Sequence, residues 1–173
     1  MATREDYSGG KEAAAEDFER ILAEHGAAIA RVAASYARTA GDRDDLYQEI
    51  AVALWQALPS FRGECSERTF VFRVAHNRAI SYLARRRIHD PLPENERDRG
   101  PDPETEYLRG QRSEALLRAV RRLPIAYRQV VTLVLEGLEY AEAAEVLGIS
   151  ENNVGVRMNR GRQMLRKLLE EHR

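Results

Sequence analysis

Arginine side chains gather in two stretches of the chain that carry no acidic residue. Residues 73–87 contain five arginines, and residues 154–167 contain four arginines and one lysine. Guanidinium groups bind phosphate oxygens through paired, charge-assisted hydrogen bonds, so both stretches are suited to a nucleic-acid backbone. The whole chain has 27 basic and 28 acidic residues and a net charge of −1. Binding to nucleic acid must therefore depend on these local surfaces or on help from a partner.

The same sequence offers no residue set for catalysis or for metal binding. Cys65 is the only cysteine, which excludes an internal disulfide, and we interpret it as a small loop residue. The histidines show no metal-ligand spacing with it; they are His25, His76, His89 and His172. There is also no phosphate-binding loop and no paired nucleophile and base. The sequence thus predicts a protein that acts by binding rather than as an enzyme, with no catalytic, cofactor-binding or metal-binding residue.

Hydrophobic runs in the chain are short. A membrane span needs about 18 consecutive apolar residues, and no such run occurs. Residues 1–16 hold charges and Gly9-Gly10 in place of the apolar core of a signal peptide. We therefore expect a cytoplasmic protein without direct membrane insertion.

Residues 138–154 have the pattern of a helix-turn-helix. A short helix with an apolar stripe ends at Gly148, which is free to take the positive φ of a helix C-terminus. Ser150 then suits the N-cap of a second helix, because its hydroxyl accepts a bond from a backbone amide one turn further on. Val154 is placed to pin the second helix onto the first. Such a unit presents its second helix to the major groove of DNA.

Apolar spacing along the chain predicts helices only, so the expected fold is all-α with two helical domains. Residues 17–89 carry three amphipathic helices. Residues 107–173 carry four, and the last two form the helix-turn-helix. Between the domains, residues 90–106 hold four of the six prolines and seven acids, a composition that favours a flexible acidic linker. Residues 1–16 are expected to form a disordered arm.

The second and third helices of the first domain each have a distinctive face. Apolar residues recur at four-residue steps on one side of the second helix, which leaves Asp45, Gln48 and Glu49 on the other. A polar loop then holds one aromatic residue, Phe61, and the third helix carries the first arginine stretch. Charged faces on amphipathic helices are usually only solvated, so charge alone does not identify a binding site.

These motifs together resemble the bacterial sigma factors of RNA polymerase. Similar to region 2 of that family are Asp44-Asp45-Leu46-Tyr47-Gln48-Glu49-Ile50, Trp55, Phe61, Phe70-Val71-Phe72-Arg73-Val74-Ala75-His76-Asn77-Arg78 and Arg85-Arg86-Arg87. Similar to region 4 are Leu123-Pro124, Leu138-Glu139-Tyr140 and residues 154–165. The extracytoplasmic-function (ECF) group keeps only these two regions, and the resemblance covers roughly residues 18–170. It implies that residues 17–89 are region 2 and residues 107–173 are region 4.

The resemblance implies a protein that binds core RNA polymerase and directs it to promoter DNA. Docking on the clamp helices of the polymerase would fall to Asp45, Gln48 and Glu49. Opening and reading the minus-10 element would fall to Phe61, Arg62, Arg73, Asn77, Arg78, Arg85 and Arg86. Reading the minus-35 element in the major groove would fall to Ser150, Asn152, Asn153, Val156, Arg157, Arg160 and Arg162. An anti-sigma factor is a further implied partner, and no small-molecule substrate is expected.

The chemistry of these residues suits such roles. Aromatic rings and arginines hold unpaired bases and their backbone, although core packing is the alternative for Phe61 and our preferred interpretation for Phe70 and Tyr82. In the last helix, Arg160 and Arg162 are better placed to bind phosphates than to read bases.

The chain also departs from the family pattern. The family usually has Trp-Leu in place of Phe70-Val71 and Asp in place of Ser81, which leaves the minus-10 preference open. Gly155 replaces a common Lys, and Gly161 replaces a common Ala. Each glycine costs a helix up to about 1 kcal/mol relative to alanine, and we expect a weaker DNA contact at Gly155. A stand-alone helix-turn-helix regulator is the alternative function.

Overall fold

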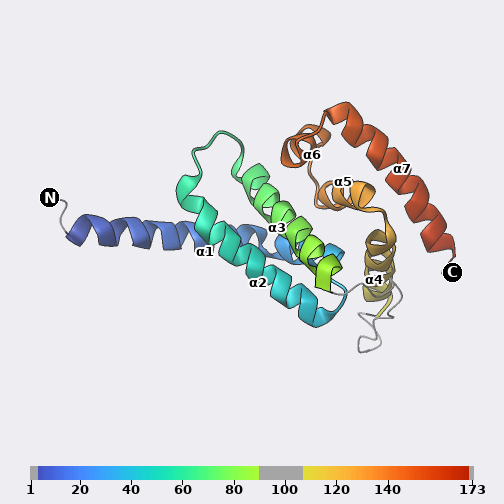
Figure 1. The fold of residues 1–173 in the computed structure, drawn as a ribbon, viewed down its shortest axis with the longest axis horizontal. Helices are drawn as coiled ribbons and strands as arrows, with labels where there is room; N and C mark the ends of the chain where they lie inside the picture. Colours follow the sequence, from blue (N-terminus) through green and yellow to red (C-terminus); the bar gives the residue numbers. More distant parts are fainter. Residues whose placement is uncertain (1–3, 90–106, 172–173) are drawn as a thin grey trace.

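The computed structural model describes residues 4–89 and 107–171, with side chains in 15–86 and 113–171. Regular structure in these ranges is entirely helical (Figure 1), which confirms the expected all-α fold with two helical domains. The first range is termed the front half and the second the back half. The expected linker, residues 90–106, lies outside the described residues. Across the described part, no helix is both long enough and apolar enough to cross a membrane.

Three helices build the front half. They are α1 (Arg4–Tyr36), α2 (Ala40–Ala57) and α3 (Glu67–His89), and a short 3-10 turn η1 (Leu58–Ser60) follows α2. α1 begins well before its apolar stripe, because the Lys, Glu and Ala residues at 11–16 favour helix. The stretch for which the sequence predicts a disordered arm is thus helical from Arg4 onward.

Local signals explain where α2 begins and ends. The Asp42 N–H donates to Thr39 Oγ1, and the Thr39 N–H donates to Asp42 Oδ2, both at 3.1 Å. This reciprocal capping satisfies amides that a helix N-terminus leaves free. Pro59 follows the last turn of α2 and cannot continue an α-helix, so the chain passes through η1 into the loop before α3.

Four helices build the back half. They are α4 (Tyr107–Arg122), α5 (Ile125–Leu135), α6 (Tyr140–Leu147) and α7 (Glu151–Glu170). Gly148 ends α6 with φ +64°, and the Ser150 hydroxyl accepts a hydrogen bond from the Asn153 N–H at 3.3 Å at the start of α7. The helix-turn-helix expected from the sequence therefore forms with the expected cap residues.

Each half buries one face of every helix. Leu46, Ile50 and Leu54 of α2 are fully buried against α1 and α3. In the back half, α7 packs on α5, and a Cβ added at Gly161 would come within 2.7 Å of Val131 Cγ2. Gly161 thus permits close approach of two helices, whereas the sequence alone indicated only a helix-weakening residue.

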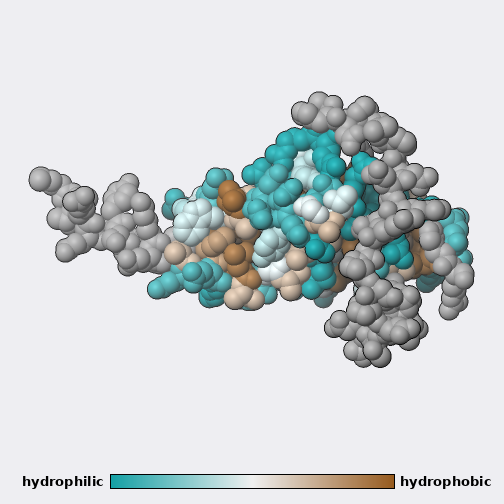
Figure 2. All heavy atoms as spheres, turned by 90° about the horizontal axis from the view of Figure 1, so that it is seen from below, coloured by the Kyte–Doolittle hydropathy of each residue, from teal (hydrophilic) through white to brown (hydrophobic). Residues whose placement is uncertain are grey.

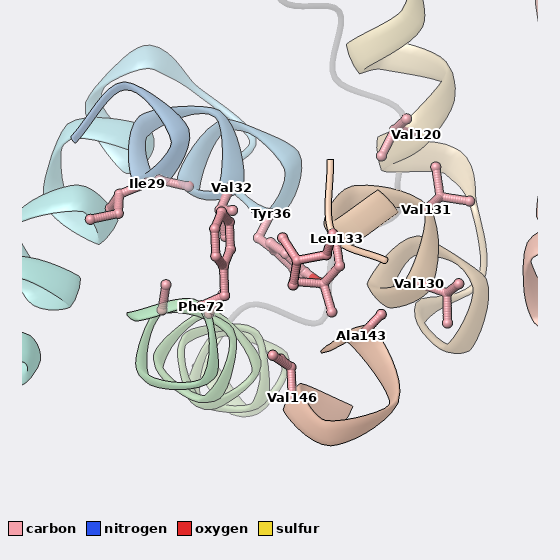
Figure 3. Packing of buried hydrophobic residues seen from close by; sticks show 14 of the residues in the cluster. Ile29, Val32, Tyr36, Phe72, Val120, Val130, Val131, Leu133, Ala143 and Val146 are labelled. Atoms are coloured by element: carbon pink, nitrogen blue, oxygen red, sulfur yellow. The ribbon is translucent and has the colours of Figure 1, made fainter. Parts of the chain in front are cut away.

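The two halves share one continuous core. α3 packs against α6, and the C-terminal part of α1 packs against α4 and α5. Figure 3 shows Tyr36 of α1 pointing toward Leu133 of α5, and Val146 of α6 pointing toward α3. Tyr36, Leu133 and Val146 are all buried.

Candidate functional site

The outer face of α2 carries the residues expected to dock on the polymerase. Asp45 and Gln48 are exposed, because the buried residues of α2 lie on the opposite side of the helix. Glu49 lies at the edge of this face with a side chain that is 36% exposed. The structure therefore brings all three residues to one surface.

Apolar side chains lie on the same outer face and were not singled out from the sequence. Val52 is 52% exposed and Trp55 is 43% exposed. The Trp55 ring meets the Phe18 ring of α1 edge-on, with centroids 5.2 Å apart. Figure 2 shows apolar atoms next to polar ones on the part of the molecule just beyond the grey end of α1. The sequence could have indicated this exposed apolar area, because Val52 is an apolar residue four positions after Gln48 on the polar side of the helix.

Ion pairs join the acidic face of α2 to the arginines of α3. Glu49 accepts a hydrogen bond from Arg85, and Arg78 lies 3.9 Å from the same carboxylate. Asp42 pairs with Arg86. Burial disfavours the charged form of Asp42, but hydrogen bonds from Arg86 and Thr39 outweigh that effect and lower its pKa. The two charged faces that looked separate in the sequence therefore meet along one edge.

The side chains of α3 that are expected to bind the minus-10 element point in different directions. Asn77 is exposed, and the Ser81 hydroxyl beside it donates to the Asn77 carbonyl oxygen at 2.9 Å. Arg73 is half-buried and donates to Glu145 Oε1 of α6 at 2.9 Å. Arg78, Arg85 and Arg86 turn toward α2, so the expected minus-10 residues of α3 do not lie on one face.

One aromatic residue of the loop pairs with one of α3. Phe61 stacks on Phe70 with ring centroids 4.6 Å apart and planes tilted by 32°. Both rings are only partly buried, and Arg62 beside them is exposed. The Ser66 hydroxyl accepts a hydrogen bond from the Thr69 N–H at 3.0 Å, which fixes where the loop ends and α3 begins. Phe61 is therefore neither free in solvent nor fully within the core.

α7 carries the residues expected to read the minus-35 element. Asn152, Asn153, Arg160 and Arg162 are exposed, and Val156 is 44% exposed. Two of the expected residues have structural partners. Ser150 uses its hydroxyl to cap α7, and half-buried Arg157 donates from Nε to Asn153 Oδ1 at 2.9 Å.

A shallow open hollow lies between α6 and α7. Its lining residues are Tyr140, Glu151, Asn152, Gly155, Val156 and Asn159. Gly155 leaves this space beside the Tyr140 ring, where an added Cβ would sit at 3.7 Å, an ordinary contact distance. Sequence reasoning missed Tyr140 and Asn159 as surface residues of this region. The sequence did contain a signal: Asn152, Val156 and Asn159 are spaced by four and then three residues, which places them on one face of a helix.

One group of potential metal ligands joins α1 to α3. Ligand atoms of Glu24, His25 and Glu67 lie within 4.8 Å of one another. Both carboxylate oxygens of Glu67 already accept hydrogen bonds from Arg20, at 2.9 and 2.6 Å. These hydrogen bonds lower the pKa of Glu67. The group is therefore best described as an ion-pair network that fixes α3 on α1.

Comparison with known proteins identifies both halves. The family described as Sigma-70 region 2 matches residues 21–88, and the family described as Sigma-70, region 4 matches residues 113–165. The first match contains the outer face of α2 and nearly all of α3. The second contains α6 and residues 151–165 of α7.

Whole relatives match over most of their length. The RNA polymerase sigma factor CnrH of Cupriavidus metallidurans is 30% identical over 88% of this chain and 86% of its own. The ECF RNA polymerase sigma factor SigM of Mycobacterium tuberculosis is 29% identical over 88% of this chain and 76% of its own. The ECF RNA polymerase sigma-E factor of Escherichia coli K12 is 30% identical over 72% of each chain.

Solved structures agree in fold. CnrH in complex with the cytosolic domain of CnrY has a TM-score of 0.67 at 27% identity, over 93% of this chain and 94% of that one. The sigma factor RpoE of Bartonella quintana, in complex with the anti-sigma factor NepR, has a TM-score of 0.74 at 21% identity, over 91% and 99%. With regions 2 and 4 both present and relatives of the ECF group matching across them, this chain belongs to the ECF sigma factors, which direct RNA polymerase to promoters in transcription initiation.

Proposed function

We propose that this sigma factor works in the cytoplasm through three surfaces: the outer face of α2 for core polymerase, α3 with its preceding loop for the minus-10 element, and α7 for the minus-35 element. The observation that carries the proposal is that these surfaces lie on separate helices of one chain. The protein acts by binding and carries out no chemical step, so the polymerase supplies the catalysis.

Core docking would use an apolar centre with a polar rim. Val52 and Trp55 supply apolar area on the outer face of α2, and Asp45, Gln48 and Glu49 surround it with acceptors and charge. Interfaces of this composition gain affinity from the buried centre and specificity from the rim. Charge complementarity would favour a basic partner surface.

Minus-10 binding would use the Phe61–Phe70 pair and the exposed parts of α3. A partly exposed aromatic pair offers a stacking platform for an unpaired base. Arg62 is exposed next to Phe61 in the loop, and Asn77 is exposed seven residues after Phe70 on α3. Arg73, Arg78, Arg85 and Arg86 would contact the DNA backbone after exchanging a carboxylate partner for a phosphate.

Minus-35 binding would use α7 together with two residues beyond those expected from the sequence. Asn side chains pair with adenine through two hydrogen bonds, and apolar side chains contact the thymine methyl group. Asn152, Val156 and Asn159 therefore form a base-reading row, and Tyr140 borders it across the hollow. Ser150, Asn153 and Arg157 position this surface, and Arg160 and Arg162 bind phosphates.

An anti-sigma protein is a further proposed partner. Both similar structures, CnrH with CnrY and RpoE with NepR, are complexes of a sigma factor with another protein. The exposed apolar centre of α2 gives such a partner a surface on which it would exclude the polymerase.

Transcription in vitro tests the proposal most directly. Core RNA polymerase with this protein should initiate on a subset of a promoter library, and core polymerase alone should not. Because the chain has a net charge of −1, the free protein should bind the selected duplex weakly at physiological salt. A stand-alone regulator would be favoured if the free protein bound the duplex tightly and sequence-specifically and if no initiation occurred when polymerase was added.

A further inference from the structure

An unpaired acid stands at the start of α7, the helix otherwise rich in arginine. Residues 151–169 hold Glu151 as their one acid, together with four arginines and one lysine. Glu151 lies in the first turn of α7 and is exposed. Among the residues that the structure describes, no group donates a hydrogen bond to its carboxylate or forms an ion pair with it. A carboxylate beside DNA phosphates lowers non-specific affinity, so an acid at this place calls for a compensating contact.

The neighbours of Glu151 on the helix surface explain why its carboxylate is unpaired. Side chains three and four positions later lie on the same side of a helix, and a lysine or arginine there would form an ion pair. These positions hold Val154, which is buried, and Gly155, which has no side chain. Gly155 therefore leaves the Glu151 carboxylate available to a ligand.

Glu151 belongs to the surface that is proposed to read bases. Steps of four residues from Glu151 to Gly155 to Asn159 place these three residues on one side of α7. All three line the hollow between α6 and α7. The other lining residues are Tyr140, Asn152 and Val156. The acid thus lies next to the row of side chains that would contact base edges in the major groove.

The chemistry of a carboxylate distinguishes the four bases. An ionised carboxylate can only accept hydrogen bonds. In the major groove guanine and thymine present acceptors, and adenine presents an amino donor next to its N7 acceptor. Cytosine presents its N4 amino group and no acceptor of its own. Any other base would leave the carboxylate desolvated and facing an acceptor, which costs affinity.

We propose that Glu151 is a specificity-determining residue that selects cytosine at one position of the minus-35 element, and that Gly155 permits this by leaving the carboxylate unpaired. The Glu151 carboxylate accepts a hydrogen bond from the cytosine N4 amino group and disfavours the other three bases. This inference rests on the proposed placement of α7 in the minus-35 element. It adds a base that the asparagines and Val156 do not read.

Promoter selection by the holoenzyme tests the preferred base. Core polymerase with this protein binds a promoter library whose minus-35 segment is randomised, and the bound DNA is sequenced. The parent protein should enrich cytosine at one position about fivefold over each other base, the lower end for a good base contact. Glu151→Gln should shift that position toward adenine, because a glutamine amide pairs with the adenine N6 and N7 groups. Glu170→Gln, the same charge change at an exposed residue near the far end of α7, should keep cytosine.

A modified base tests the donating atom. N4-methylcytosine keeps the pair with guanine and replaces the amino hydrogen that faces the major groove by a methyl group. At the selected position it should weaken binding by the parent holoenzyme about fivefold. With Glu151→Ala the same replacement should have little effect. Glu151→Ala should also bind promoters with other bases at this position more tightly than the parent does, because the carboxylate no longer opposes them.

Gly155→Lys tests the role assigned to the glycine. A lysine four positions after Glu151 pairs with its carboxylate in the favoured orientation, so the enrichment of cytosine should fall about twofold. The added cation also strengthens binding of all sequences alike, so the readout is the ratio between bases rather than the affinity. Gly155→Ala adds an uncharged side chain and should retain the parent ratio. Equal ratios for Gly155→Lys and Gly155→Ala would overturn this role of Gly155.

Two outcomes would overturn the cytosine contact: Glu151→Gln keeps the parent base at every position, or the position that responds to Glu151 holds a base other than cytosine. Selection with Val156→Ala separates this failure from failure of the proposed function. Base preferences that respond to Val156→Ala but not to Glu151 substitutions would reject the Glu151 contact alone. An absence of any base preference in the randomised segment, for the parent and for Val156→Ala, would reject minus-35 reading by α7 itself. Far-ultraviolet circular dichroism confirms that each variant is folded.

Discussion

His76 is a buried histidine whose ionisation links stability to pH. It lies in α3 at 5% exposure, with its Nδ1 3.5 Å from the Tyr36 hydroxyl. Burial lowers its pKa to about 4. In the unfolded chain the value returns to about 6.5, so between these values the unfolded state binds a proton that the folded state does not. Stability is therefore full above about pH 6.5 and falls as the pH drops toward 4.

Urea unfolding at pH 7 and pH 5 measures this effect. The unfolding free energy of the parent protein should be about 2 kcal/mol lower at pH 5 than at pH 7, because over this range the unfolded chain protonates His76 and the folded chain does not. In the His76→Gln variant the unfolding free energy should differ little between pH 7 and pH 5. Asp42 and Glu67, whose pKa values are lowered from 3.8 and 4.5, lose their contribution only as the pH falls below those values and therefore lie outside this window. An equal loss in the variant would contradict the assignment.

Gly155 and Gly161 of α7 should respond in opposite ways to alanine. At Gly161 the new methyl would come within 2.7 Å of buried Val131, so Gly161→Ala should destabilise the fold by about 1 to 3 kcal/mol. At Gly155 it would meet only the Tyr140 ring at 3.7 Å, so Gly155→Ala should be neutral or stabilise by up to about 1 kcal/mol. Thermal melting of both variants is the measurement. Destabilisation of the same size at both positions would contradict this difference in packing.

Val156 is expected to contact one thymine methyl group. Replacing that thymine of the minus-35 element by uracil removes only the methyl, and holoenzyme binding should weaken about threefold to fourfold, the value of one buried methylene-sized group. With Val156→Ala the same replacement should have little effect. Each thymine is replaced in turn, and uracil at the other positions provides the control. A parent protein indifferent to uracil at every position would exclude the contact.

At the scale of the element, α2 is expected to dock through its apolar centre. Gln48→Ala with Val52→Ala should weaken association with core polymerase about tenfold, because hot-spot truncation costs more than 1 kcal/mol. Both side chains are exposed, so the fold should be retained. Glu19→Ala, at an exposed residue of α1, is the control. Surface-immobilised core gives the affinities, and a double variant that binds like the control would place docking elsewhere.

The sequence predicted the elements well where periodicity and caps are local. Four-residue steps through Leu46, Ile50 and Leu54 located α2, and Gly148 with Ser150 located the turn between α6 and α7. Partial exposure of Trp55 was not predictable, because it depends on how α1 passes beside α2.

At the scale of the whole molecule, the contact between the halves was not predictable from the sequence. Periodicity showed that Tyr36 lies on an apolar stripe but not which helix covers it. Nothing in the sequence marks Glu136 and Glu145 as contact residues, because their partners Arg31 and Arg73 are 105 and 72 residues away in the chain. Pairings at such separations carry no local sequence signal.

The shared core also bears on how such proteins can be recombined. A chimera that joins this front half to the back half of a relative keeps these contacts only where the relative has a surface that fits Tyr36 and an acid that pairs with Arg31. A junction between residues 89 and 107 would leave every helix intact, but it would separate helices that pack against one another in the shared core. Exchange of promoter preference between sigma factors of this kind is therefore better designed as a transplant of the exposed α7 residues alone, with the side of the back half that faces α1 and α3 left unchanged.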